Sequence, residues 1–296
     1  MKSETITYRV HEVSEYINWV YFFHAWGFSP RYASVASVCD CVSCQSNWIF
    51  SFPYEERIKA QEAVQLYMEA QKVLKELDEQ TSVRTLYRLC PTNAEGDDLL
   101  IDGLRFPCLR QQKVKEDGQP YLCLSDFIRP LSSGIPDTIG LFATTVHEPD
   151  TEEADAYKRL LTQTLTDRLA EAGAEKLHQY VRKEAWGYAP DEQLNIEQLH
   201  KEEFQGIRPA VGYPSLPDQS VNFLLDQLLD MHQIGITLTE NGAMNPHASV
   251  SGLMFAHPQA HYFSVGKIGE DQFQDYVRRR GLSADEMRKF LAACLE

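Results

Sequence analysis

Residues 206–214 are Gly206-Ile207-Arg208-Pro209-Ala210-Val211-Gly212-Tyr213-Pro214, and this stretch decides how the chain is interpreted. Two prolines fix φ within it, and Gly212 allows the backbone to approach a ligand closely. Arg208 offers a planar fork that suits a carboxylate, and Tyr213 offers an aromatic face with one hydroxyl. The residue types therefore predict either a rigid ligand-binding loop or a structural turn whose arginine pairs with a neighbouring aspartate.

Helices are expected on both sides of this loop, where apolar residues recur at three- and four-residue spacing. The longest contains Gly173, which we expect to mark a kink or a close contact. The expected helices and their caps are 55–80, 151–186 after Asp150, 223–232 before Gly235, 270–280 before Gly281, and a last helix that begins at the capping box of Ser283 and Glu286.

Strands are expected where short apolar runs are bounded by Gly, Pro and Asp. These runs are 99–101, 104–106, 139–143, 249–255 and 262–266. The last two flank the turn-like sequence His257-Pro258-Gln259-Ala260, so we expect them to form a hairpin. Helices and strands that alternate in this way predict an α+β fold.

The composition excludes several classes of protein. The chain has 296 residues and a formal net charge of -15, which disfavours a nucleic-acid partner because such a surface repels phosphates. No apolar run approaches the roughly 20 residues of a membrane-spanning helix. The N-terminus lacks the apolar core of a signal peptide, so we expect a cytoplasmic protein with no membrane partner.

Six of the seven cysteines fall into two groups, and the seventh is Cys294. An odd number without a secretion signal disfavours a disulfide framework, and Cys90, Cys108 and Cys123 have the apolar neighbours of core residues. Cys39, Cys41 and Cys44 are close enough in sequence to hold zinc or three corners of an iron–sulfur cluster. No fourth ligand adjoins them, although His24 or a distant cysteine could serve. The alternative is a loop of free, partly exposed cysteines.

The loop also carries a resemblance. The pattern R-P-x-x-G-Y-P resembles the C-terminal activation domain of cobalamin-dependent methionine synthase. Further stretches resemble that family in the same order along the chain: Tyr16-Ile17-Asn18-Trp19, Phe22-Phe23, Asp167-Arg168-Leu169-Ala170-Glu171-Ala172, Trp186-Gly187-Tyr188-Ala189-Pro190, Leu238-Thr239-Glu240 and Ala248-Ser249-Val250-Ser251-Gly252. The likeness covers the chain from about Tyr16 onward.

The resemblance implies a fold. It is a single C-shaped domain, residues 1–296, built on a twisted antiparallel β-sheet with flanking helices, one of them long. Within it we distinguish an N-terminal segment, 1–54, with a Cys-rich insertion that the usual domain lacks, and a main body, 55–296.

The resemblance also implies a function. Members of the family bind S-adenosylmethionine and dock on the cobalamin domain when its cofactor has oxidised to cob(II)alamin. The methyl group then passes to cobalt while a flavodoxin-type protein supplies an electron. This chain lacks the homocysteine, folate and cobalamin modules, so we expect it to act in trans on a separate cobalamin-binding core. It would be a component of a methyltransferase of methionine biosynthesis, not a catalyst alone.

By similarity, the ligand site has the following roles. Arg208 would hold the carboxylate of S-adenosylmethionine, Tyr213 and Tyr262 would supply aromatic contacts, and acidic residues would lie near the sulfonium. The predicted ligand-binding residues are Asn18, Glu171, Glu202, Arg208, Pro209, Ala210, Gly212, Tyr213, Tyr262 and Phe263. Asn18 replaces the family's usual acidic residue, and Phe263 stands where the family often has a second tyrosine.

Three alternatives remain open at this level. The scaffold could serve a metal or redox protein that uses Cys39, Cys41 and Cys44, or a ligand-binding partner that has lost reactivation. Residues 230–235 also match D-x-H-x-x-G, a cobalt-ligand pattern of cobalamin domains. We expect His232 to lie in a last helical turn instead, because the preceding run is amphipathic.

Overall fold

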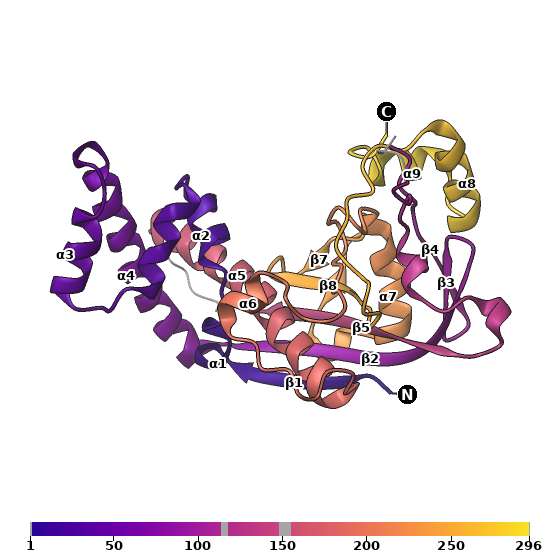
Figure 1. Cartoon of the computed structure of the whole chain (residues 1–296), viewed down its shortest axis with the longest axis horizontal. Coiled ribbons are helices and arrows are strands. Elements are labelled where there is room, and N and C mark those ends of the chain that lie inside the picture. The colour runs from indigo at the N-terminus through magenta and orange to yellow at the C-terminus, as the bar shows by residue number, and fades with distance from the viewer. Residues whose placement is uncertain (1, 114–117, 148–154, 296) are drawn as a thin grey trace.

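An antiparallel sheet runs through the middle of the molecule (Figure 1). The computed structural model describes residues 2–113, 118–147 and 155–295. The described residues form β1 (Glu4–Arg9), β2 (Ser82–Glu95), β3 (Asp98–Ile101), β4 (Leu104–Pro107), β5 (Asp137–Val146) and β8 (Ser249–Met254) in this sheet, and β6 (Thr237–Leu238) and β7 (Met244–Asn245) in a small separate one. The strand order is β4-β3-β2-β5-β8, and β1 shares an edge of β2 with β3.

Helices pack on the sheet and also lie beyond it at both ends of the molecule (Figure 1). They are α1 (Val10–Ser14), α2 (Trp19–Ala25), α3 (Val42–Phe50), α4 (Arg57–Gln80), α5 (Ala156–Tyr180), α6 (Ile196–His200), α7 (Asn222–Leu229), α8 (Glu270–Arg280) and α9 (Ala284–Phe290). Helices α3 and α4 lie at one end of the molecule, and α8 and α9 at the other. Within the described ranges, no helix combines the length and apolar character needed to cross a bilayer.

The two faces of the sheet pack against different helices because side chains alternate along each strand. In β5, Phe142 belongs to the cluster that contains Leu177 of α5, whereas its neighbour Leu141 belongs to the cluster that contains Leu225 of α7. All four side chains are fully buried. The sheet is therefore held between α5 and α7, and this packing fixes the position of α5 on one face of the sheet.

Gly173 lies where α5 packs tightly against β2. A Cβ at this position would lie 2.5 Å from Cγ1 of Val83 in β2. The expected close contact is thus confirmed, and a glycine is needed because any side chain would push the helix away.

Most expected elements are confirmed. The helix expected at 55–80 is present as α4, which ends at Gln80 as predicted and is preceded by a short 3-10 turn, Tyr54–Glu56. Helix α8 ends at Gly281 with φ 69°, and the Ser283–Glu286 capping box begins α9. The α+β class, the curled antiparallel sheet and its flanking helices are as predicted.

Two expected helices have different ends. The first residues of the 151–186 prediction and its cap Asp150 lie outside the described residues; in the described part, Asp155 caps α5 through the backbone N–H of Tyr157. The predicted end is a π-helical turn, Val181–Ala185. Helix α7 stops at Leu229 because Asp230 adopts φ 58°, and Met231–Ile234 form a 3-10 turn that ends at Gly235. His232 lies exposed on that turn.

The expected hairpin was wrong. Residues 249–254 form β8, but 262–266 is an extended loop and not a strand. The backbone groups of Phe255 pair instead with Ile207, at 3.0 and 2.9 Å, and the N–H of Val265 donates to the carbonyl of Pro214. Distant loops thus occupy the positions that a local hairpin would have filled.

Candidate functional site

A cavity of about 640 Å³ lies between α5, the start of α2 and three loops. Nine of the ten predicted ligand residues line it: Asn18, Glu171, Glu202, Arg208, Pro209, Ala210, Tyr213, Tyr262 and Phe263. Gly212 does not; its φ of 85° shapes the turn, and its N–H donates to the carbonyl of Leu216. The volume lies within the ~300–1,000 Å³ range of sites for small molecules.

Strand β8 holds the loop 207–211 in place. The N–H of Val211 donates to the carbonyl of Ser251 at 2.9 Å, and the N–H of Leu253 donates to the carbonyl of Pro209 at 3.1 Å. Between them Gly252 faces the loop, so the backbone of Pro209 and Ala210 can approach the strand. The loop is therefore an additional edge of the sheet, and this makes it rigid.

Gly252→Ala is expected to lower the free energy of unfolding by about 1 to 3 kcal/mol through overpacking. The added Cβ would lie 2.3 Å from the carbonyl oxygen of Pro209 and 2.9 Å from Cα of Ala210. Urea denaturation measures the change. Gly269→Ala is the control, because its Cβ would meet the carboxylate end of Asp271, which can move. Equal effects of the two substitutions would contradict this account.

Arg208 forms the base of the cavity, with its side chain 14% exposed. One terminal nitrogen donates to Oε2 of Glu175 at 2.9 Å, and the other lies 3.2 Å from Nδ1 of His178. Because a guanidinium can only donate, Nδ1 of His178 must accept. The imidazole proton is then on Nε2, which lies 3.3 Å from the hydroxyl of Tyr188. This chain fixes the direction of the fork.

The segment 262–264 forms one wall. The backbone N–H of Arg208 donates to the Tyr262 hydroxyl at 2.9 Å, which joins this wall to the loop. The Ser215 hydroxyl donates to the carbonyl of Phe263 and accepts from its N–H. Both aromatic rings are thus positioned by hydrogen bonds to the 207–215 loop.

Acidic groups surround the opening. Glu171 accepts from the half-exposed Tyr213 hydroxyl and pairs with Arg168 at 3.0 Å. Oε1 of Glu175 is buried and has no hydrogen-bond partner. Partial burial, aided by Glu175 and opposed by Arg208, raises the pKa of Glu202. A cation would find favourable partners here.

Asn18 lies at the edge of this cavity as the N-cap of α2. Its Oδ1 accepts from the N–H of Val20 at 3.1 Å. The side chain therefore has a structural role as well as a place beside the cavity. As an amide it adds no negative charge.

His178 makes the stability of the site depend on pH. Burial, reinforced by the charges of Arg182 and Arg208, holds its pKa well below the usual 6.5. As the pH falls below about 6.5, the unfolded chain binds a proton here that the native chain does not. We expect this residue alone to remove up to about 1.4 kcal/mol of unfolding free energy per pH unit in that window.

Urea unfolding at about pH 7.5 and about pH 5.5 measures this loss. His178→Gln keeps an acceptor for Arg208 and should lower the slope, because glutamine does not titrate. Identical slopes for the two proteins would show that His178 is not the cause.

Sequence reasoning missed Glu175 and His178, which contact Arg208 directly. A signal was present for Glu175, since it follows Glu171 by four residues and therefore shares a face of α5 with it. His178 had no such signal, because a single histidine on a helix is common in a core.

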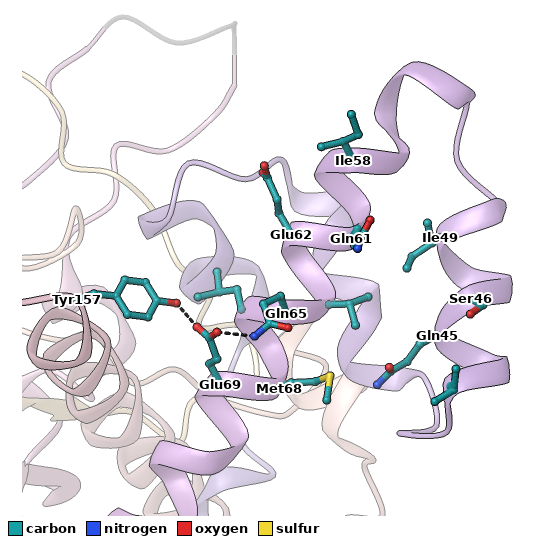
Figure 2. A pocket seen from close by; sticks show the side chains of 13 residues that line it. Gln45, Ser46, Ile49, Ile58, Gln61, Glu62, Gln65, Met68, Glu69 and Tyr157 are labelled. Carbon is teal, nitrogen blue, oxygen red and sulfur yellow. Dashed lines mark hydrogen bonds between the residues drawn. The ribbon is translucent and has the colours of Figure 1, made fainter. Parts of the chain in front are cut away.

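A second hollow, of about 680 Å³, lies between α3 and α4 (Figure 2). It contains none of the predicted ligand residues. Figure 2 shows Gln45 and Ile49 of α3 on one side of the hollow and α4 on the other, where Gln65 donates to Glu69 beside Tyr157 of α5. At the N-terminus of α3, the Sγ atoms of Cys39, Cys41 and Cys44 lie within 4.8 Å of one another, and the described residues add no further His, Cys, Asp or Glu to the group.

The fold of the chain is similar to that of a solved protein. The chain's fold is similar to the crystal structure of the MetH reactivation domain bound to AdoHcy, with a TM-score of 0.84 and 35% sequence identity over 100% of this chain and 90% of that one. Residues 9–281 match the family model for the activation domain of vitamin B12-dependent methionine synthase, a range that includes the whole lining of the Arg208 cavity. The chain therefore belongs to the family of vitamin B12-dependent methionine synthase activation domains.

Proposed function

We propose that the Arg208 cavity binds S-adenosylmethionine and presents its methyl group to the cobalt of a cobalamin-binding partner, for the reductive remethylation of cob(II)alamin. The observation that carries the proposal is the gathering of nine predicted residues, from segments far apart in the sequence, around one nearly buried arginine fork. AdoHcy, which the similar reactivation domain binds, is S-adenosylmethionine without the methyl group.

The charges of the cavity suit the charged groups of this ligand. Its amino-acid end carries one carboxylate and one ammonium group. Arg208 would hold the carboxylate, and the unpartnered Oε1 of Glu175 would accept from the ammonium. Glu171 and Glu202 at the opening would offset the sulfonium charge, and Tyr213 would add a cation–π contact of about 0.5 to 2 kcal/mol.

Methyl transfer from a sulfonium requires orientation and not proton transfer. The residues of this chain bind and orient the ligand, and the partner's cobalamin supplies the chemistry of the accepting metal. The rigid 207–211 loop, anchored on β8, suits this task because a small displacement of the methyl group would misalign it with the acceptor.

The described residues form one activation-domain fold, in which both the N-terminal segment and the main body contribute to a shared core. We infer that the chain acts in trans on the cobalamin-binding core of methionine synthase, with a flavodoxin-type protein as electron donor.

Calorimetric titration of S-adenosylmethionine is the first test. We expect a micromolar dissociation constant, about -8 kcal/mol. Next, the chain is added to a separately purified cobalamin-binding core with a reduced flavodoxin, and the return of methionine synthesis is measured. No heat and no thermal shift at millimolar ligand would contradict the binding proposal. Binding without reactivation would favour a ligand-binding partner that has lost reactivation, for which the uncharged Asn18 is the supporting observation.

A further inference from the structure

The cysteine cluster at the N-terminus of α3 consists of Cys39, Cys41 and Cys44. It is separate from the Arg208 cavity and has no role in the function proposed above. Cys41 is the N-cap residue of α3, and its Sγ accepts from the N–H of Cys44 at 3.4 Å. Cys39 and Cys41 are exposed and Cys44 is partly exposed, so ions can reach all three. The other four cysteines are buried elsewhere.

The three sulfur atoms have the spacing that one metal ion requires. Bonds of about 2.3 Å from a tetrahedral zinc ion place its sulfur ligands about 3.8 Å apart. The three Sγ atoms lie within 4.8 Å of one another. Small rotations of the exposed side chains would bring them to the bonding distance without movement of the backbone.

We propose that Cys39, Cys41 and Cys44 bind one Zn²⁺ through their thiolates and leave the fourth tetrahedral position to solvent. Thiolates select soft or borderline ions, and zinc accepts three protein ligands plus one exchangeable ligand. Each thiol that binds loses its proton to solvent, and no electron is transferred. Zinc affinity therefore falls as the pH falls.

The loose packing of α3 is an independent reason to expect that a metal ion stabilises the N-terminus of this helix. None of its nine residues is buried. Partial contacts hold it, such as the bond from the Trp48 indole to the Ser34 hydroxyl at 3.1 Å and the edge contact of Trp48 with Phe52. Val42, Gln45, Ser46 and Ile49 of α3 line the hollow of Figure 2. A zinc ion would fix its N-terminus where apolar burial does not.

Metal analysis of the full chain, expressed without a tag and purified without chelators, tests this proposal. We expect close to one equivalent of zinc. After its removal, added Co²⁺ should give the sulfur-to-cobalt charge-transfer band and the intense visible bands of a tetrahedral thiolate site. Hydrogen exchange of residues 39–50 should be slower with zinc than without it.

Matched variants identify the ligands. Cys39→Ser, Cys41→Ser and Cys44→Ser should each lose most of the zinc. Ser43→Ala in the first turn of α3 and Cys294→Ser, which removes a distant thiol, should keep it. Affinity for S-adenosylmethionine should change less than about twofold when zinc is removed, so this test and that of the proposed function can fail separately.

Three outcomes would overturn the proposal. They are less than about a tenth of an equivalent of zinc even after reconstitution, the absorption of an iron–sulfur cluster, and an intact mass that shows a disulfide in protein kept under reductant. Any of them would leave the Arg208 cavity unaffected.

Discussion

Replacement of Arg208 by Ala is expected to weaken S-adenosylmethionine binding by roughly 150-fold, or about 3 kcal/mol. The fork would make two charge-assisted hydrogen bonds to the ligand carboxylate, each worth about 1.5 to 3 kcal/mol. Its direction is fixed before the ligand arrives, by Glu175 at 2.9 Å and His178 at 3.2 Å. Calorimetry with wild type and variant measures the change.

A loss of affinity must be distinguished from a loss of stability, because Arg208→Ala also leaves the nearly buried Glu175 carboxylate without its cation. Adding Glu175→Gln to the variant removes that charge and should restore melting temperature without restoring affinity. Arg208→Lys keeps the charge but not the fork, so an intermediate loss is expected. Affinity within threefold of wild type in a folded Arg208→Ala protein would mean that the carboxylate binds elsewhere.

Part of this site could be predicted because Arg208, Pro209, Ala210 and Tyr213 belong to one short motif in the loop 206–214. Pro209 restricts the backbone, and the resemblance of the surrounding motif then suggested the roles of Arg208 and Tyr213. The structure places both residues on the cavity. Gly212 was misjudged: it was expected to let the backbone approach the ligand, but its φ of 85° forms a turn and not a ligand contact.

What could not be predicted depends on pairing between distant segments. The run 262–266 has the composition of a strand, yet the backbone of Phe255 is occupied by Ile207, nearly fifty residues earlier in the chain. Strand β2, which has 14 residues, was not predicted; Pro91 stands within it, and a proline argues against a central strand. In both cases tertiary contacts, and not local composition, decide whether the segment is a strand and which segment it pairs with.

Replacement of Arg182 by Ala is expected to lower the free energy of unfolding by about 3 to 5 kcal/mol, the cost of breaking a buried ion pair. Two guanidinium nitrogens of Arg182 donate to the Glu192 carboxylate at 2.8 and 2.7 Å. The two side chains are 0% and 6% exposed, so water cannot replace the lost partner. The Phe204 ring, 4.2 Å from the guanidinium carbon, would lose a cation–π contact as well. Guanidinium chloride denaturation measures the loss.

The size of this effect comes from the carboxylate left behind and not from the strength of the pair. One guanidinium nitrogen of Arg182 is buried without any partner, so the native pair is itself imperfectly satisfied. The double variant Arg182→Met with Glu192→Leu removes both charges and should recover most of the stability, as uncharged replacements of buried pairs often do. Its affinity for S-adenosylmethionine should be unchanged, because the new methionine side chain would still pack against the Phe204 ring, which lines the cavity. A double variant as unstable as Arg182→Ala would mean that the π-helical turn at 181–185 needs the ion pair for its geometry.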